Sequence, residues 1–117
     1  KQKLVDVYLT ELKHHAVRLP SCPKGKKHSW QSFHLLLDDS IDRDLLIDKL
    51  KIAGIGTNLG AQCIPYQDYY AKKYKLDVPS LFPNGLRAYK HGLVLPLFER
   101  LTSNDILHIV RTLEKEI

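Results

Sequence analysis

The sequence has 117 residues, 44% hydrophobic and 26% charged, which is the composition of one ordinary globular domain. Its longest apolar runs are far too short to cross a bilayer, and no signal-peptide pattern opens it. The net charge of +5 is spread along the chain, and the one dense cluster (24–28) lacks any nucleic-acid-binding motif. We expect a solvated basic loop there, the alternative being a weak contact with a phosphate-bearing partner.

The first predicted element is a helix, because apolar residues recur with a helical period from the start of the chain (Leu4, Val5, Tyr8, Leu9 and Leu12). No capping residue precedes this pattern, and the sequence contains no methionine. Both features indicate a piece of a longer protein. A short strand at 17–20 and a loop rich in Pro, Gly and Lys follow.

The segment 30–37, "WQSFHLLL", is the clearest strand, since it is rich in aromatic and aliphatic residues. Strand alternation places Trp30, Ser32, His34 and Leu36 on one face, and Gln31, Phe33, Leu35 and Leu37 on the other.

A helix is predicted over 42–53, with Asp42 as its N-cap and Gly54 as its terminator. Its inner stripe consists of Leu46, Leu50 and Ala53.

The stretch 54–65, "GIGTNLGAQCIP", is dense in glycine. It is not a Walker A loop, because Ala61 and Gln62 stand where that motif needs Lys and Ser or Thr. It is not a dinucleotide fingerprint either, because Gly60 comes one residue too late and a helix precedes it. Two interpretations remain from the residues: a helix-stopping glycine followed by a short strand, or the lip of a pocket.

The tyrosines of segment 66–74 have helical spacing, which is more typical of a core or rim than of a binding site. A short helix closed by Gly92 and a strand at 93–97, covered on both faces, come next. The last helix opens with a capping box, Thr102 and Asp105. Leu101 and Ile106 form its hydrophobic staple. Its apolar stripe consists of Ile106, Ile109, Val110 and Leu113.

This order of elements predicts one α/β domain over residues 1–117, an α+β two-layer sandwich in which helices pack on a small, mostly antiparallel sheet. The six histidines lack metal-site spacing, and Cys22 and Cys63 are expected to be free thiols. We therefore predict no catalytic, cofactor-binding or metal-ligating residue within the chain itself.

Four blocks, taken in order, resemble the C-terminal domain of the DegT-type sugar-nucleotide aminotransferases. They are "KHSWQSFHLLLD", "IDRDLLIDKLKIAGIGTNLGAQCIP", "YQDYYAKKY" and "FPNGLRAYKHGLVLPLFERLTSNDILHIV", and together they cover almost the whole chain. The resemblance implies the small C-terminal domain of a fold-type I enzyme that uses pyridoxal phosphate. It also implies that the cofactor lysine lies in a large N-terminal domain, so residues 1–117 alone should bind no cofactor and be inactive.

For the parent protein, the resemblance implies conversion of a keto-sugar nucleotide to an amino sugar for surface polysaccharide or a related glycan. Glutamate would be the amino donor, and the enzyme would be a cytoplasmic homodimer that binds neither nucleic acid nor membrane. Within this chain, the resemblance makes 54–65 a pocket lip. Asn58 and Gln62 would offer amide groups, Gly60 would allow close approach, and Gln31 would replace a family histidine.

Two other functions stay open at the level of sequence. One is a free-standing α/β ligand-binding or regulatory module without catalysis. The other is a basic nucleic-acid-binding domain.

Overall fold

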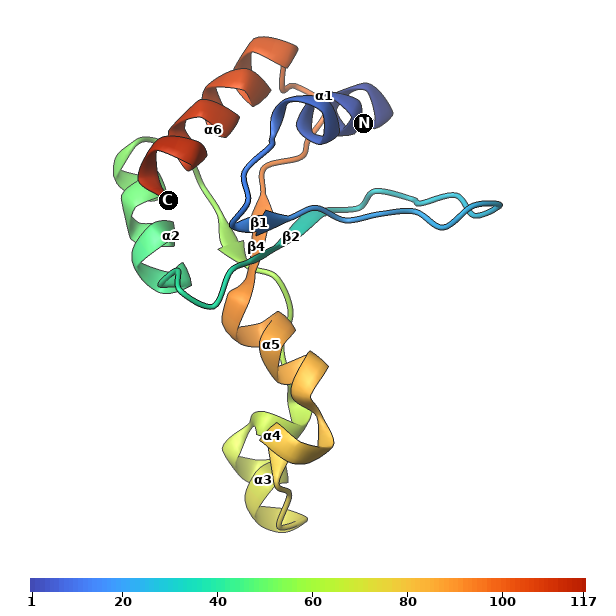
Figure 1. The fold of residues 1–117 in the computed structure, drawn as a ribbon, viewed down its shortest axis with the longest axis vertical. Helices are drawn as coiled ribbons and strands as arrows, with labels where there is room; N and C mark the ends of the chain where they lie inside the picture. The colour runs from blue at the N-terminus through green and yellow to red at the C-terminus, as the bar shows by residue number, and fades with distance from the viewer.

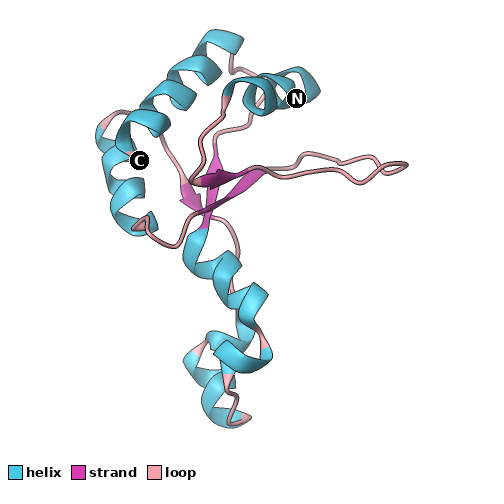
Figure 2. Cartoon of the chain, in the orientation of Figure 1, coloured by secondary structure: helices cyan, strands magenta, loops and turns pink.

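Four short antiparallel strands, in the order β1-β2-β4-β3, form an open sheet in the computed structural model, which describes all 117 residues. Figures 1 and 2 show its helices and strands. In chain order these are α1 (Gln2–Glu11), β1 (Val17–Arg18), β2 (Phe33–Leu37), α2 (Arg43–Ile52), β3 (Asn58–Leu59), the 3-10 helix η1 (Ile64–Tyr66), α3 (Asp68–Lys73), α4 (Val78–Leu81), α5 (Pro83–His91), β4 (Gly92–Leu95) and α6 (Ser103–Glu116).

Helices α1, α2 and α6 cover one face of the sheet, and this layer holds the main core (Figure 1). Tyr8 of α1 stacks on Phe33 of β2 with ring centroids 4.6 Å apart, and its hydroxyl donates to the Pro96 carbonyl at 2.7 Å. Leu50 and Leu113 are fully buried in the same cluster. The predicted α/β two-layer sandwich with an antiparallel sheet is confirmed.

The best-specified helices form where their caps predict. Asp42 accepts from the Leu45 N–H at 3.0 Å, and Gly54 beyond the end of α2 has a φ of +83°. Thr102 and Asp105 form the complete capping box of α6. The stripe predicted for α2 is wrong at one position, because Ala53 caps the helix and is exposed while Leu46 and Leu50 are buried.

Strand β2 is shorter than predicted and its alternation fails at its start. Trp30 has a φ of +48°, which turns the chain before the strand begins at Phe33. As a result Trp30 is buried near Phe33, with centroids 6.0 Å apart, instead of sharing a face with His34. The segment 17–20 likewise forms only a two-residue strand, since Pro20 has no N–H for a ladder.

Between β3 and β4 the chain makes a long excursion away from the sheet. We call residues 60–91 (η1, α3, α4 and α5) the extension, and the remainder of the chain the body. The extension projects from the body in Figure 1 and makes the molecule elongated. The radius of gyration of the whole chain is 15.6 Å, against about 13 Å for a compact chain of this length.

The four tyrosines of the segment 66–74 lie on the extension and are exposed, so of the two structural positions expected for them, core or rim, the core is excluded. The extension has its own small buried cluster instead, formed by Cys63, Val78 and Leu86.

Candidate functional site

The face of the sheet opposite α1, α2 and α6 carries most of the candidate residues. Phe33, Leu35 and Leu37 of β2 point into the core, so His34 and Leu36 point to the other side. The register aligns His34, Val94 and Asn58 in one row across β2, β4 and β3. We call this side of the sheet the open face.

Gln31 and Asn58, both predicted from the sequence, are brought together on the open face. They line one shallow cavity of about 250 Å³ together with Thr57 and Val94. Both predicted side chains are exposed, and the Asn58 side-chain oxygen accepts from the N–H of Leu59 at 2.8 Å. The amide nitrogen of Asn58 and the whole Gln31 amide therefore remain available to a polar ligand.

Gln62 lies elsewhere. It lines a separate cavity of about 430 Å³ on the extension, among apolar residues that include Ile64, Leu81 and Phe82. The structure therefore divides the predicted pocket lip into a part on the sheet and a part on the extension.

Gly60 stands between these two parts, where β3 ends. Its N–H donates to the carbonyl of Gly92 at 3.3 Å, joining the start of the extension to its end. A methyl group at Gly60 would overlap the imidazole of His34, and one at Gly92 would meet His34 and the Ala88 carbonyl. Close approach is thus required at Gly60, but toward His34 of the same chain.

His34 was not predicted as a site residue, although it lies at the centre of the open face. Burial lowers the pKa of its imidazole, because desolvation disfavours the charged form. Its Nε2 atom is buried and has no hydrogen-bond partner. The neutral ring therefore acts as a packing surface against the two glycines.

Beyond His34, the open face becomes positively charged. A cavity of about 440 Å³ lies between the base of the 19–32 loop and α5, with Arg18, Arg87 and Asn84 in its lining. The Nε atom of Arg87 is 3.7 Å from a carboxylate oxygen of Asp39, while Arg18 makes no ion pair. This end of the face suits an anionic group.

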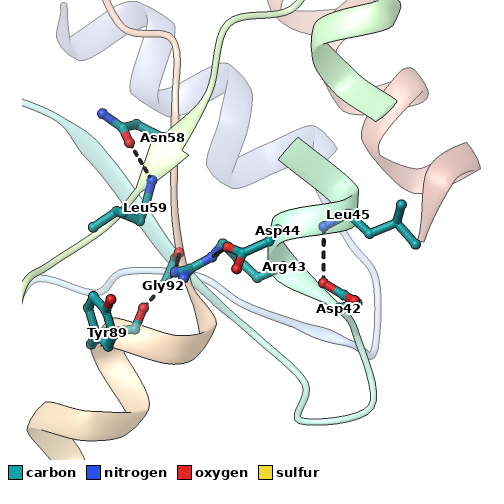
Figure 3. Close-up of polar contacts among 8 residues, drawn as sticks. All are labelled: Asp42, Arg43, Asp44, Leu45, Asn58, Leu59, Tyr89 and Gly92. Atoms are coloured by element: carbon teal, nitrogen blue, oxygen red, sulfur yellow. Dashed lines mark hydrogen bonds and ion pairs between the residues drawn. The ribbon is translucent and has the colours of Figure 1, made fainter. Parts of the chain in front are cut away.

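Arg43, the other residue that sequence reasoning missed, is the one charged residue that is buried, with 7% of its side chain exposed. Its Nη1 atom donates to the carbonyls of Tyr89, at 2.5 Å, and Gly92, at 3.0 Å (Figure 3). Its Nε atom donates to Asp44 at 2.7 Å. A signal was present, because a cation in the first turn of a helix opposes the helix dipole and must serve another purpose.

The arrangement offers amide and guanidinium groups that can bind a polar ligand. No group of three or more His, Cys, Asp or Glu residues could hold a metal ion. Cys63 is buried and Cys22 is exposed, both as free thiols. None of the helices has the length and apolar character that crossing a membrane demands.

The family model described as the DegT/DnrJ/EryC1/StrS aminotransferase family matches residues 1–114. The chain belongs to this family. Among curated proteins it is similar to the uncharacterised protein MJ1066 of Methanocaldococcus jannaschii, at 24% identity over 98% of this chain and 31% of that protein.

Solved structures of sugar aminotransferases share the fold. The PMP form of Spr1654 from Streptococcus pneumoniae superposes with a TM-score of 0.85 at 19% identity, over 98% of this chain and 29% of that one. The sugar aminotransferase CalS13 from Micromonospora echinospora superposes with a TM-score of 0.77 at 21% identity, over 97% of this chain and 29% of that one. Spr1654 has also been solved in a PLP form. The chain therefore spans about 30% of the length of these proteins and has the fold found in this part of fold-type I aminotransferases.

Proposed function

We propose that residues 1–117 are the C-terminal domain of a longer aminotransferase that uses pyridoxal phosphate to convert a keto-sugar nucleotide to an amino sugar. The observation that carries this proposal is the family match over residues 1–114, in a chain that corresponds to about 30% of its relatives. The domain would supply one wall of the substrate cleft and leave the chemistry to the rest of the protein.

The lysines of this chain support that division of roles. Pyridoxal phosphate needs a lysine that forms an imine in a sheltered site, where its amine can lose its proton. All thirteen lysines of this chain are exposed. The residues present do not fit the cofactor, so we assign it to the preceding part of the enzyme and predict that residues 1–117 alone are inactive.

The open face supports a sugar nucleotide as the substrate. The amides of Gln31 and Asn58 can bind sugar hydroxyls, and the arginines at the other end, Arg18 and Arg87, suit phosphate oxygens. Resemblance to the family adds glutamate as the amino donor, a homodimer in the cytoplasm, and glycan biosynthesis as the destination of the amino sugar.

The experiment compares the two half-reactions in the full-length enzyme. Gln31→Ala and Asn58→Ala should each raise KM for the sugar nucleotide by roughly 3–10-fold, the worth of one hydrogen bond, and leave the glutamate half-reaction unchanged. Gln2→Ala, on α1, is the matched control, since Gln2 bonds to Asp6 on the same helix. Equal changes in both half-reactions, or none, would contradict the assigned site.

Gly60 is unsuitable for this experiment, because its substitution would displace His34 whatever the substrate does. The proposal also requires that residues 1–117, mixed with pyridoxal phosphate and dialysed, retain no cofactor absorbance. A retained lysine-linked band would place the chemistry within this chain. If the native protein has the mass of residues 1–117 alone, the free-standing ligand-binding or regulatory module becomes the better assignment.

A further inference from the structure

The extension leaves the body and returns to it at the same point, which we call the neck and define as Gly60 and Gly92. These residues are joined by the hydrogen bond from the Gly60 N–H to the Gly92 carbonyl. Of the extension's helices, α5 makes the main contacts with the sheet. The small buried cluster of the extension is separate from the core of the body. The angle between the two parts therefore depends on how α5 is held at the neck.

Arg43 reaches the neck from the body. It lies in the first turn of α2, and Figure 3 shows its guanidinium extending to the end of α5. The Gly92 carbonyl accepts from both Arg43 and the Gly60 N–H, so three segments of the chain meet at one oxygen. The guanidinium also lies 6.0 Å from the centroid of the Tyr89 ring.

The chemistry of a helix end explains why an arginine suits this place. The last carbonyls of a helix lack intrahelical partners and form the negative end of the helix dipole. The Nη1 atom of Arg43 donates to one such carbonyl, that of Tyr89, and to the carbonyl of Gly92 just beyond the helix, so the end of α5 and the start of β4 are held together. Asp44, its ion-pair partner, is 81% exposed, so water screens that pair and the carbonyl bonds matter more.

We propose that Arg43 is a positioning residue that holds α5, and with it the whole extension, at one angle to the sheet. Gln31 just before β2 and Asn58 on β3 line one cavity of the body, whereas Gln62 lies on the extension, so Arg43 sets how these two parts of the candidate site face each other. The effect on the candidate site rests on the proposed function, whereas the role of Arg43 in fixing the angle of the extension does not.

The test measures orientation directly, in residues 1–117 without any ligand. Backbone residual dipolar couplings in solution report how α5 lies relative to α1, α2 and α6. In the wild-type chain, one alignment tensor should fit the body and the extension together. In Arg43→Gln each part should still fit alone, but the couplings of the extension should shrink and no longer share the tensor. The Gly60 amide should also exchange roughly tenfold faster.

Two further variants separate positioning from charge and from general stability. Asp44→Asn removes the ion pair and leaves both carbonyl bonds, so it should keep the wild-type couplings. Arg43→Lys should fall between wild type and Arg43→Gln, because lysine keeps a charged donor but its side chain is shorter than that of arginine. Shared-tensor couplings in Arg43→Gln would overturn the proposal. So would loss of the folded body in both Arg43 variants, since Arg43 would then be needed for folding itself.

In the full-length enzyme, Arg43→Gln should raise KM for the sugar nucleotide, with Asp44→Asn as the control. A changed angle in residues 1–117 with an unchanged KM would leave the positioning role standing and count against the proposed substrate site.

Discussion

The body and the extension follow one another in the same chain, yet they differ in what they bury. The body contains a cluster of 17 buried hydrophobic residues shared between three helices and the sheet, whereas the extension contains a cluster of three. Seven of the ten large hydrophobic side chains that are exposed lie on the extension. The list is Ile64, Tyr66, Tyr69, Tyr70, Tyr74, Leu81 and Phe82.

This difference indicates that the two parts are stabilised in different ways. The body has enough apolar burial to fold around its own core, while the extension depends on local helices and on the neck. Its exposed aromatic residues form the kind of surface that is usually covered by another part of a protein. A longer enzyme, as proposed above, would supply such a cover.

The largest expected effect comes from truncating the core of the body. Leu113 of α6 is fully buried, so Leu113→Ala should lower the free energy of unfolding by about 2–5 kcal/mol. Leu81→Ala on the extension removes the same atoms from a residue that is 59% exposed, so it should change the free energy of unfolding little. Chemical denaturation of the two variants checks this. Similar losses in both would mean that the extension shares the core of the body.

The neck provides the second test. Gly60→Ala should destabilise the chain by about 1–3 kcal/mol, since the added methyl group overlaps the imidazole of His34. Adding His34→Ala to Gly60→Ala should recover part of this loss by removing the ring, and a double-mutant cycle measures the coupling. Additive effects would show that Gly60 and His34 do not contact each other in solution.

How far the sequence could predict this structure differs between the two parts. In the body, caps and periodic apolar residues such as Asp42, Thr102 and Leu113 act locally, so α2 and α6 could be placed almost to the residue. Trp30 is the exception, because its left-handed φ turns the chain before β2, and the aromatic and aliphatic pattern of a strand does not reveal such a turn.

The candidate site was harder to predict for the same reason. Gln31 and Asn58 meet because β2 and β3 both pair with β4, and a resemblance to the family was needed to select them. Gln62 lies apart from them, because the chain turns into the extension after Gly60. The roles of His34 and Arg43 depend on carbonyls and glycines distant in sequence, and residue spacing carries no information about such contacts.

A third prediction compares matched valines in the two parts. Val78 in the extension and Val110 in the body are each 3% exposed, so truncation to Ala removes the same buried atoms, worth about 1–2 kcal/mol. Val110→Ala should speed hydrogen exchange throughout the protected core. Val78→Ala should speed exchange in α4 and α5 while leaving β2 and β4 unchanged. Equal effects on the sheet amides would show that the body and the extension unfold as one unit.

The smallest effect concerns the capping box of α6, in the body. Thr102 donates to a carboxylate oxygen of Asp105 through its N–H at 2.8 Å and its hydroxyl at 2.9 Å, and these bonds lower the pKa of Asp105. A carboxyl whose pKa is lower in the folded state stabilises the fold above its unfolded pKa, about 4, and loses this contribution as pH falls through the folded value. Asp105→Asn should therefore lower Tm most near neutral pH, and the difference from wild type should narrow in acid. Thr102→Ala, which removes the hydroxyl donor and costs about 1 kcal/mol, should weaken the same pH dependence. A Tm difference that stays constant from neutral pH into acid would mean that the charge of Asp105 adds nothing to the cap.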